Sequence, residues 1–515
     1  GNSWKPRDPE LTQRDFFWNL HLLFEHSCMA STLLLCLSTL LFFLPSANFQ
    51  VVEEGFISAF ISDKGLDFVK DLLVDRAFSA LTPLDVPQVE GSLKIPLVGK
   101  ARIVLSNIRI HQVDVSSSYV KPGETGVVIV VSGATASLSM NWFYSCSTWL
   151  VPIAISDHGG ASVQAEGMEV GLTLHLENQD GTLGLSVLDC GCYLESISIK
   201  LDGGASWLYQ GLADAFEEQI ESSIEKAVSS KVKEWVTNLG SQLQNLPKEI
   251  PMNGIATLNV TFVNDFVLTD SSIGFEINGL LTAMDQLPLM KFNHKKSLPS
   301  IPCLGPTKMV GISVREEVFN SALVTFFRDN LMTWIADQLP DQSLLNTAGW
   351  RFVIPQLFKK YPNDDIYLNF SAAAPPIATI SNHDIDATIS FDMTVNVFDA
   401  GALTPVICFA MSIDALGSVE IWRNTVVGTV RVDDFTLALK WSKVGNLHMH
   451  LVQSVVWAAL RTMVLPYVNL LLRRGFPLPS LHGFALQNAE MLYASSRIVI
   501  CGDVAFANCS DFRVN

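Results

Sequence analysis

Hydrophobic and polar residues alternate with a period of two over several long stretches of this chain. Every second residue is apolar over 168–176, 385–397 and 435–441, and the residues between are mostly polar. Residues 178–181, Asn-Gln-Asp-Gly, have the composition of a tight turn, and the alternation resumes over 183–187. This pattern predicts long strands with one apolar face, joined into a strongly bent antiparallel sheet.

Other segments have the period of an amphipathic helix. We predict helices over 63–81, 204–247, 315–339 and 447–473, with a kink at Pro466 in the last. At 1.5 Å per residue the second would span roughly 60 Å, so its domain should be elongated. Apolar residues at helical spacing are Leu66, Val69, Leu73 and Phe78 in the first helix, Leu208, Leu212, Phe216, Ile220, Ile224, Val228 and Val232 in the second, Val318, Phe319, Leu323 and Phe326 in the third, and Leu451, Val455, Leu460 and Val464 in the fourth.

The order of these segments suggests an internal duplication. A helix, several strands and a longer helix follow one another in the first half of the chain, and the same order returns in the second half. Four prolines and a basic cluster fall between the halves, which favours an extended connector. We therefore expect an N-terminal domain over 48–285, a proline-rich linker over 286–308 and a C-terminal domain over 309–515.

Composition and charge narrow the function. The 515 residues are 49% hydrophobic and 17% charged, so much apolar surface must be buried in long elements or pockets. No stretch after residue 47 has the roughly 18–20 uncharged apolar residues of a membrane span. The net charge of −17 argues against nucleic acid as a partner. The charge is uneven: residues 48–285 hold 13 Lys and Arg against 29 Asp and Glu, net −16, whereas residues 286–515 hold 18 of each.

The beginning of the chain predicts export. Met29 precedes an apolar run, Leu33–Leu44, which ends in Pro45-Ser46-Ala47. This is the layout of a secretory signal peptide, so we assign 29–47 to one and keep an N-terminal membrane anchor as the alternative. We expect residues 1–28 to be a leader or extension and leave them out of the fold prediction.

Sites for glycosylation and for disulfide bonds are consistent with secretion. Sequons occur at Asn259, Asn369 and Asn508. Seven of the nine cysteines follow residue 47, and an odd number leaves at least one thiol unpaired within the chain. Cys190 and Cys192 are the only closely spaced pair, and no second pair or His cluster completes a zinc set, so we expect no metal site.

Enzyme motifs are missing from the sequence. It contains no Gly-x-Ser-x-Gly, His-Glu-x-x-His, P-loop or Gly-x-Gly-x-x-Gly motif. His448 and His450 are interpreted as surface or helix-capping residues. The acidic residues of the second helix, Glu217, Glu218, Glu221 and Glu225, are interpreted as a solvated face. We therefore expect no catalytic residues, no cofactor and a binding function.

Several segments, in order along residues 53–505, resemble the family of bactericidal/permeability-increasing protein and lipopolysaccharide-binding protein, with details similar to its plant members. They are Gly55-Phe56-Ile57 to Asp67, Leu93-Lys94-Ile95-Pro96 with Gly99-Lys100, Asp189-Cys190-Gly191-Cys192 with Ser206-Trp207-Leu208, Pro355 to Pro362 with Ala374-Pro375-Pro376, and Arg474-Gly475-Phe476-Pro477-Leu478-Pro479.

The resemblance implies an α+β fold with two tandem elongated antiparallel β-barrels. Each barrel would be closed by two helices, and a central sheet would join them into a boomerang shape. An apolar pocket under the helices of each barrel would hold a phospholipid. The residues implied are Leu66, Val69, Leu73, Leu212, Phe216 and Ile220 in the N-terminal barrel, and Phe319, Leu323, Val455 and Leu460 in the C-terminal barrel. The alternative is that these side chains are ordinary core.

One departure from the family concerns its disulfide. The family joins the strand-end cysteine to one on the long helix, where this chain has Lys233. Cys146 is therefore expected to pair with Cys190 or Cys192 across neighbouring strands. Cys501 with Cys509 is another candidate pair.

The second departure concerns charge. The bactericidal members have a strongly basic first barrel that grips lipopolysaccharide phosphates, whereas residues 48–285 are acidic here. Lys94, Lys100 and Arg102 still cluster near the expected tip and could bind phosphate. The alternative is an ordinary solvated strand edge.

Two functional hypotheses follow. The first is a secreted protein that binds lipopolysaccharide or phospholipid, in innate immune recognition of the bacterial outer-membrane surface. The second is an extracellular transfer protein for zwitterionic or neutral lipids, without an immune role. An extracellular hydrolase would require an unrecognised catalytic triad.

Overall fold

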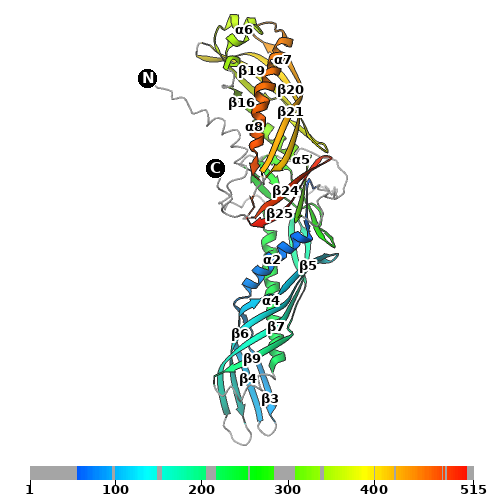
Figure 1. Ribbon diagram of the computed structural model, residues 1–515. Helices are drawn as coiled ribbons and strands as arrows, with labels where there is room; N and C mark the ends of the chain where they lie inside the picture. The colour runs from blue at the N-terminus through cyan, green and yellow to red at the C-terminus, as the bar shows by residue number, and fades with distance from the viewer. Residues whose placement is uncertain are drawn as a thin grey trace, which may run out of the picture.

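Long strands dominate the architecture, as the period-two pattern predicts. The computed structural model describes residues 55–95, 99–147, 154–203, 216–252, 256–283, 308–336, 342–399, 401–422, 425–477, 480–481 and 484–506. These residues form two large sheets at the two ends of an elongated molecule, with a third sheet between them (Figure 1). A small sheet of β10 (Glu249–Met252), β11 (Ala256–Asn259) and β14 (Leu281–Ala283) completes the set.

The first large sheet, the N-terminal sheet, has the core order β2-β4-β6-β7-β8, with β3, β5 and β9 paired alongside. Its strands are β2 (Leu84–Val86), β3 (Val89–Ile95), β4 (Gly99–Asp114), β5 (Ser117–Gly123), β6 (Gly126–Ser147), β7 (Ala154–Gln179), β8 (Thr182–Tyr193) and β9 (Ser196–Asp202). The predicted turn between β7 and β8 is confirmed: Asp180 and Gly181 both have positive φ angles, 52° and 83°. Such angles favour Gly and Asp in a two-residue hairpin.

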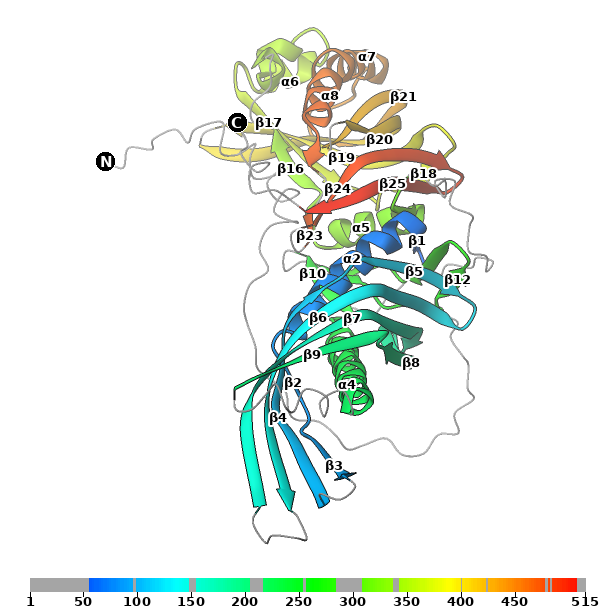
Figure 2. The same cartoon turned by 60° about the horizontal axis from the view of Figure 1, so that its bottom comes forward.

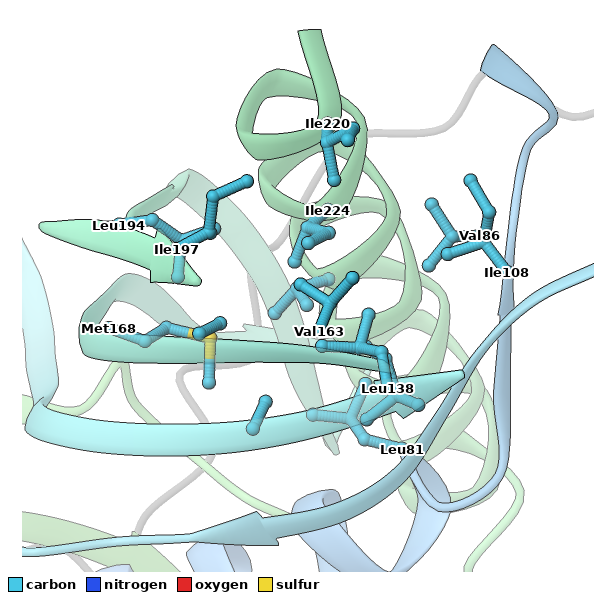
Figure 3. Packing of buried hydrophobic residues seen from close by; sticks show 14 of the residues in the cluster. Leu81, Val86, Ile108, Leu138, Val163, Met168, Leu194, Ile197, Ile220 and Ile224 are labelled. Carbon is cyan, nitrogen blue, oxygen red and sulfur yellow. The ribbon is translucent and has the colours of Figure 1, made fainter. Parts of the chain in front are cut away.

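Two helices cover the concave face of the N-terminal sheet. Helix α2 (Asp63–Ala80) confirms the first predicted helix, and Ser62 caps it by accepting a hydrogen bond from the Gly65 amide. Helix α4 (Glu217–Gln244) confirms the described part of the second, and residues 204–215 lie outside the described residues. The buried residues of α4 recur every fourth position, from Ile220 to Val236. They pack onto sheet residues such as Leu138, Val163 and Met168 (Figure 3).

The second large sheet, the C-terminal sheet, has the order β16-β17-β19-β20-β21-β22, and β18 pairs with β19. Its strands are β16 (Thr333–Ala336), β17 (Asp365–Ala372), β18 (Ile377–Ile380), β19 (Ile385–Asp399), β20 (Ala402–Trp422), β21 (Thr425–Ser442) and β22 (Phe476–Pro477). The helical elements of this half are α5 (Glu316–Arg328), η2 (Gln342–Leu345), η3 (Thr347–Trp350), α6 (Pro355–Lys360), α7 (Met449–Ala459), η4 (Leu460–Val464) and α8 (Leu465–Arg474). Figure 2 shows α7 and α8 lying along this sheet.

The central sheet combines strands from both halves of the chain. Its order is β12-β13-β1-β15-β25-β24-β23, formed by β12 (Val267–Thr269), β13 (Ser272–Ile277), β1 (Ile57–Ser62), β15 (Val310–Arg315), β25 (Arg497–Phe506), β24 (Phe484–Ala494) and β23 (Ser480–Leu481). β1 leads into α2 and β15 leads into α5, and these two strands pair antiparallel with the same alternation of burial. Two equivalent strand–helix units side by side are what a duplicated domain predicts.

Closed barrels are not found in the described residues. Both large sheets curve strongly, but each strand order has two free ends. The α+β class and the joining sheet agree with the expectation, and each large sheet is better described as a curled half-barrel.

Two helix predictions need correction. The third helix ends at Arg328 rather than residue 339, because Asn330 has a φ of 54° and residues 333–336 pair with β17 as β16. Ile335, which falls within the predicted helix, is therefore a residue of strand β16. The fourth helix contains a π-helical turn, η4, which ends two residues before Pro466, and the kink at this proline remains a prediction. A wider turn accommodates the proline, which has no amide hydrogen to donate.

Candidate functional site

A hollow lies on the N-terminal sheet towards its free end, where β3, β4 and β6 run side by side. Its volume is about 490 Å³, and Glu90, Gly91, Ser92, Lys100, Arg102, Ser145 and Cys146 line it. Strand pairing builds it: Arg102 is opposite Ser92 on β3 and Ser145 on β6. The intervening residues Ala101 and Ile103 are buried in the core. Because side chains alternate along a strand, Arg102 projects from the face of the sheet opposite to the core.

The charges of this hollow are partly paired. The Arg102 guanidinium donates to a Glu90 carboxylate oxygen at 2.7 Å, and Gln88 donates to the other oxygen at 2.7 Å. The hydrogen bond from Arg102 lowers the pKa of Glu90, so Glu90 stays ionised at neutral pH. Lys94 and Lys100 face each other across the β3–β4 hairpin. Both are exposed and neither forms an ion pair within the described residues.

The residues predicted for head-group contact therefore lie together. Lys100 and Arg102 line the hollow, and Lys94 is opposite Lys100. Glu90 was missed in the sequence because its pairing with Arg102 depends on the β3–β4 register. The alternation of Glu90, Ser92 and Lys94 on one strand was the signal that could have revealed it.

The residues predicted for an apolar pocket in the N-terminal half lie on the other face of the sheet. Leu66, Phe216 and Ile220 belong to one buried cluster, and Leu73 packs against it half-buried. Val69 is 38% exposed and lies outside that cluster. Leu212 lies outside the described residues. Three of the six residues are thus core side chains here, and their contact with a lipid remains a prediction.

In the C-terminal half the structure separates the predicted pocket residues. The buried residues of α5 are Glu317, Val318, Ser321 and Thr325, so Phe319 and Leu323 do not face inward with them. Val455 and Leu460 are half-buried on the helix that packs on β21, whereas α5 packs on β14 and β18. Leu460 contacts the C-terminal core.

The expected disulfide of Cys146 is wrong for this structure, because Cys146, Cys190 and Cys192 are all free thiols. Cys146 is opposite Ile155 near the free end of β6, whereas Cys190 pairs with Leu172, which pairs with Ile129 of β6. Positions 146 and 129 are roughly 55 Å apart along a strand at about 3.3 Å per residue. Cys501 is disulfide-bonded, and its partner lies outside the described residues, so pairing with Cys509 remains a prediction.

Cys190 faces α4, as the family's strand-to-helix disulfide implies. Its thiol contacts the Ser229 carbonyl oxygen at 3.8 Å. Burial raises the pKa of Cys190, and the nearby positive charge of Lys233 opposes that shift. Lys233 lies one helical turn after Ser229 on α4, on the helix face that Cys190 contacts. Burial, reinforced by Glu225 and Cys190, raises the pKa of Cys192 to about 12, so both thiols are protonated at neutral pH.

The side chains considered for metal or acid–base chemistry can now be placed. No three His, Cys, Asp or Glu residues gather to hold a metal in the part of the chain that the structure describes. His448 and His450 are exposed, with ring centroids 6.2 Å apart. Glu225 is more than a solvated residue, because it accepts a hydrogen bond from the Leu194 amide at 2.9 Å.

Comparison with known proteins now identifies the family. The model for the N-terminal domain of the LBP / BPI / CETP family matches residues 65–246, and the C-terminal domain model matches residues 252–506. The chain belongs to the LBP / BPI / CETP family. The resemblance noted in the sequence is thereby confirmed. The two models meet near residue 250, and the predicted linker falls largely outside the described residues, so the predicted domain boundaries remain predictions.

Relatives in this family span nearly the whole chain. An Arabidopsis thaliana protein named as a BPI/LBP family member is 50% identical over 469 residues, covering 91% of this chain and 96% of its own length. The bactericidal permeability-increasing protein of Sebastes schlegelii is 24% identical, covering 87% and 94%. Human lipopolysaccharide-binding protein is 23% identical, covering 82% and 87%.

A solved structure has a fold similar to that of this chain. The crystal structure of a lipopolysaccharide-binding protein matches with a TM-score of 0.56 at 20% identity, covering 88% of this chain and all of that chain. At that identity the likeness concerns the fold. The names of these relatives describe binding and permeability rather than catalysis.

Proposed function

We propose that this protein is a secreted lipid-binding protein that takes up lipopolysaccharide or phospholipid and acts in innate immune recognition of bacteria. The observation that carries the proposal is the hollow lined by Lys100 and Arg102, in a half of the chain that matches the N-terminal domain of the family. The names of the vertebrate relatives, which include lipopolysaccharide-binding protein, support the choice of ligand.

The phosphorylated head group of lipopolysaccharide would bind at the hollow, on the outer face of the sheet. Lys94, Lys100 and Arg102 can donate charge-assisted hydrogen bonds to phosphate oxygens, and Lys94 and Lys100 have no competing carboxylate partner in the described residues. Arg102 would exchange its exposed bond with Glu90 for one with phosphate. Exposed ion pairs contribute little stability, so this exchange costs little.

A phospholipid would be a separate ligand, because the sheet separates the hollow from the core face; its acyl chains would lie on the concave side of each large sheet, under the helices. In the N-terminal half, Leu66, Leu73, Phe216 and Ile220 supply apolar surface between α2, α4 and the sheet. In the C-terminal half, the residues proposed to contact a lipid are Val455 of α7, which is half-buried, and Leu460 of η4, which packs against the C-terminal core. A bound phospholipid, rather than a cofactor, is the expected occupant.

A second function, transfer of zwitterionic or neutral lipids without an immune role, has one observation in its favour. Residues 48–285 carry a net charge of −16, which repels anionic surfaces at long range. It has less support than the first, because vertebrate relatives are named for lipopolysaccharide.

Secretion and its modifications form part of the proposal. The signal-like segment 29–47 motivates export. The Asn369 side chain is exposed on β17 and could accept a glycan, whereas the Asn259 side-chain oxygen accepts hydrogen bonds from Thr261. Asn508 lies outside the described residues.

Native mass spectrometry with lipid extraction, on protein secreted from eukaryotic cells, tests the ligand. We expect co-purified phospholipid and salt-sensitive binding to lipopolysaccharide vesicles. The K94Q/K100Q/R102Q variant should bind lipopolysaccharide much more weakly and keep the phospholipid. Protein without any lipid would contradict the pockets, and unchanged lipopolysaccharide binding by the triple variant would contradict the head-group site.

A further inference from the structure

The long helix of the C-terminal half exposes an apolar face. Residues Met449–Arg474 have a mean hydropathy of 1.6 in their most apolar window, and no residue of that window is fully buried. This is the one described helix that is long and apolar enough to cross a membrane by length and composition. Large apolar side chains exposed on it are Leu451, Val464, Tyr467 and Leu470, and Leu470 is 52% exposed.

The opposite face of this helix is bound to the protein. Val452 is fully buried, and the Trp457 ring stacks on Phe435 of β21 at 5.5 Å. The Asn469 side chain accepts from the Val430 amide and donates to its carbonyl oxygen, both at 2.8 Å. The helix therefore lies along β21 with its length fixed against the sheet, and only its outer face is available to a partner.

The outer face is also basic, in a protein that is acidic overall. No Asp or Glu occurs from Lys443 to Ala489, although the whole chain has a net charge of −17. The exposed helix residues include Arg461, Arg473 and Arg474, and none of them forms an ion pair within the described residues, although the Arg461 guanidinium lies 5.5 Å from the Trp457 ring centroid. By contrast, Arg102, Arg109, Arg315 and Arg431 are each paired with a carboxylate.

The end of the molecule beside α7 has the same chemistry. Phe352 is 77% exposed, with the Arg351 guanidinium 4.6 Å from its ring centroid. Trp441 is exposed, with the Lys443 ammonium 5.6 Å from its ring centroid. Lys360 at the end of α6 donates to the Lys443 carbonyl oxygen at 3.1 Å, so α6 contacts the segment that follows β21. Figure 1 shows α6 and α7 together at the end of the molecule furthest from β3.

We propose that the outer face of Met449–Arg474 docks on an anionic phospholipid membrane, with Phe352 and Trp441 at the interface. A helix that presents apolar and basic residues together, without acidic ones, fits the headgroup region of such a membrane. Aromatic rings beside cations are favoured at the same depth. This surface is distinct from the hollow at the opposite end of the molecule, so the protein could bind a membrane while the hollow holds a lipid head group.

Sedimentation of the full chain with lipid vesicles tests this proposal. Vesicles of phosphatidylglycerol with phosphatidylcholine should bind the protein in a salt-sensitive way, and vesicles of phosphatidylcholine alone should bind it much more weakly. The R461Q/R473Q/R474Q variant should bind anionic vesicles about a hundredfold more weakly, from about 1 kcal/mol per basic residue near the surface. L470S should also weaken binding, and L188S is its matched control because Leu188 is 53% exposed on β8.

The outcomes separate this surface from the lipid site. K94Q/K100Q/R102Q should bind phosphatidylglycerol vesicles like the unmodified protein, while R461Q/R473Q/R474Q should retain its bound phospholipid. Equal vesicle binding by R461Q/R473Q/R474Q and the unmodified protein would overturn the proposal. A change of oligomeric state in L470S without loss of vesicle binding would also overturn it, in favour of a second copy of the chain.

Discussion

The aromatic ring of Phe216 occupies the space that a side chain at Gly91 would need. A Cβ atom on Gly91 would lie 1.8 Å from Cε1 of Phe216. Phe216 directly precedes α4 and is buried, and Gly91 lies on β3 and lines the hollow. This close approach ties the start of the long helix to the strand that carries Glu90, Ser92 and Lys94.

Replacement of Gly91 by alanine should therefore destabilise the N-terminal half. The Phe216 ring has to move within a packed core, and overpacking of this kind costs about 1–3 kcal/mol. Denaturant unfolding measures the loss. Gly171→Ala is the control, because a Cβ atom there meets nothing within 4 Å in the same sheet. Equal stability of the Gly91→Ala and Gly171→Ala proteins would contradict the packing described here.

Glu90 should weaken the binding of anionic lipid at the hollow. Its carboxylate pairs with Arg102 at 2.7 Å, and its lowered pKa keeps it ionised at neutral pH. Glu90→Gln should tighten binding to lipopolysaccharide vesicles about fivefold at low salt, from about 1 kcal/mol per charge near an anionic surface. The gain should shrink as salt is added.

A second ion pair, whose arginine lies on β4 as Arg102 does, provides the control for Glu90. Arg109 pairs with Asp85 at 2.7 Å, and neither residue lines the hollow. Asp85→Asn should leave lipopolysaccharide binding nearly unchanged. If Asp85→Asn tightens binding as much as Glu90→Gln does, the effect reflects overall charge rather than this site.

Local patterns were sufficient to predict much of the fold. The period-two pattern predicted β7, β19 and β21, and helical spacing predicted α2 and the described part of α4. The end of the third helix was predicted wrongly because the apolar residues after Arg328 continue a helical spacing. In the structure these residues form β16 and pair with β17, a later segment of the chain. The strand or helix propensity of a residue carries no information about which segment it pairs with.

The site was predictable only in part, for a similar reason. Lys94, Lys100 and Arg102 are close in sequence, so their proximity on a hairpin could be expected. The pairing of Glu90 with Arg102 and the contact of Gly91 with Phe216 depend on register and on packing between distant segments. The disulfide expectation failed because Cys146 and Cys190 lie on the same sheet at positions far apart along the strands.

Restoring the family's disulfide position should stabilise the protein. Cys190 faces α4 near Lys233, so Lys233→Cys should place a second thiol within reach of Cys190. The bond would close the loop from residue 190 to residue 233, and a disulfide that closes such a loop increases the free energy of unfolding by about 2–4 kcal/mol. Peptide mapping without reduction should detect the bond, and the melting temperature should fall on adding reductant. Lys233→Ser is the control, and a Cys190 that remains open to alkylation after unfolding of the Lys233→Cys protein would contradict this placement.

The acidic face of α4 predicts a pH effect on stability. Burial, followed by the charges of Glu217, Glu225 and Glu218, raises the pKa of Glu221 above its usual value of 4.5. A carboxyl group whose pKa is higher in the folded state stabilises the fold when protonated, so its contribution is lost as the pH rises from about 4 through the raised pKa. Glu221→Gln should therefore raise the melting temperature at pH 7, and this gain should shrink near pH 4 and in high salt.

Glu234→Gln on the same helix is the control, because Glu234 pairs with Lys231 at 3.0 Å and its loss should bring no gain. A Glu221→Gln protein that melts at or below the unmodified protein at pH 7 would show that neighbouring carboxylates do not destabilise this helix.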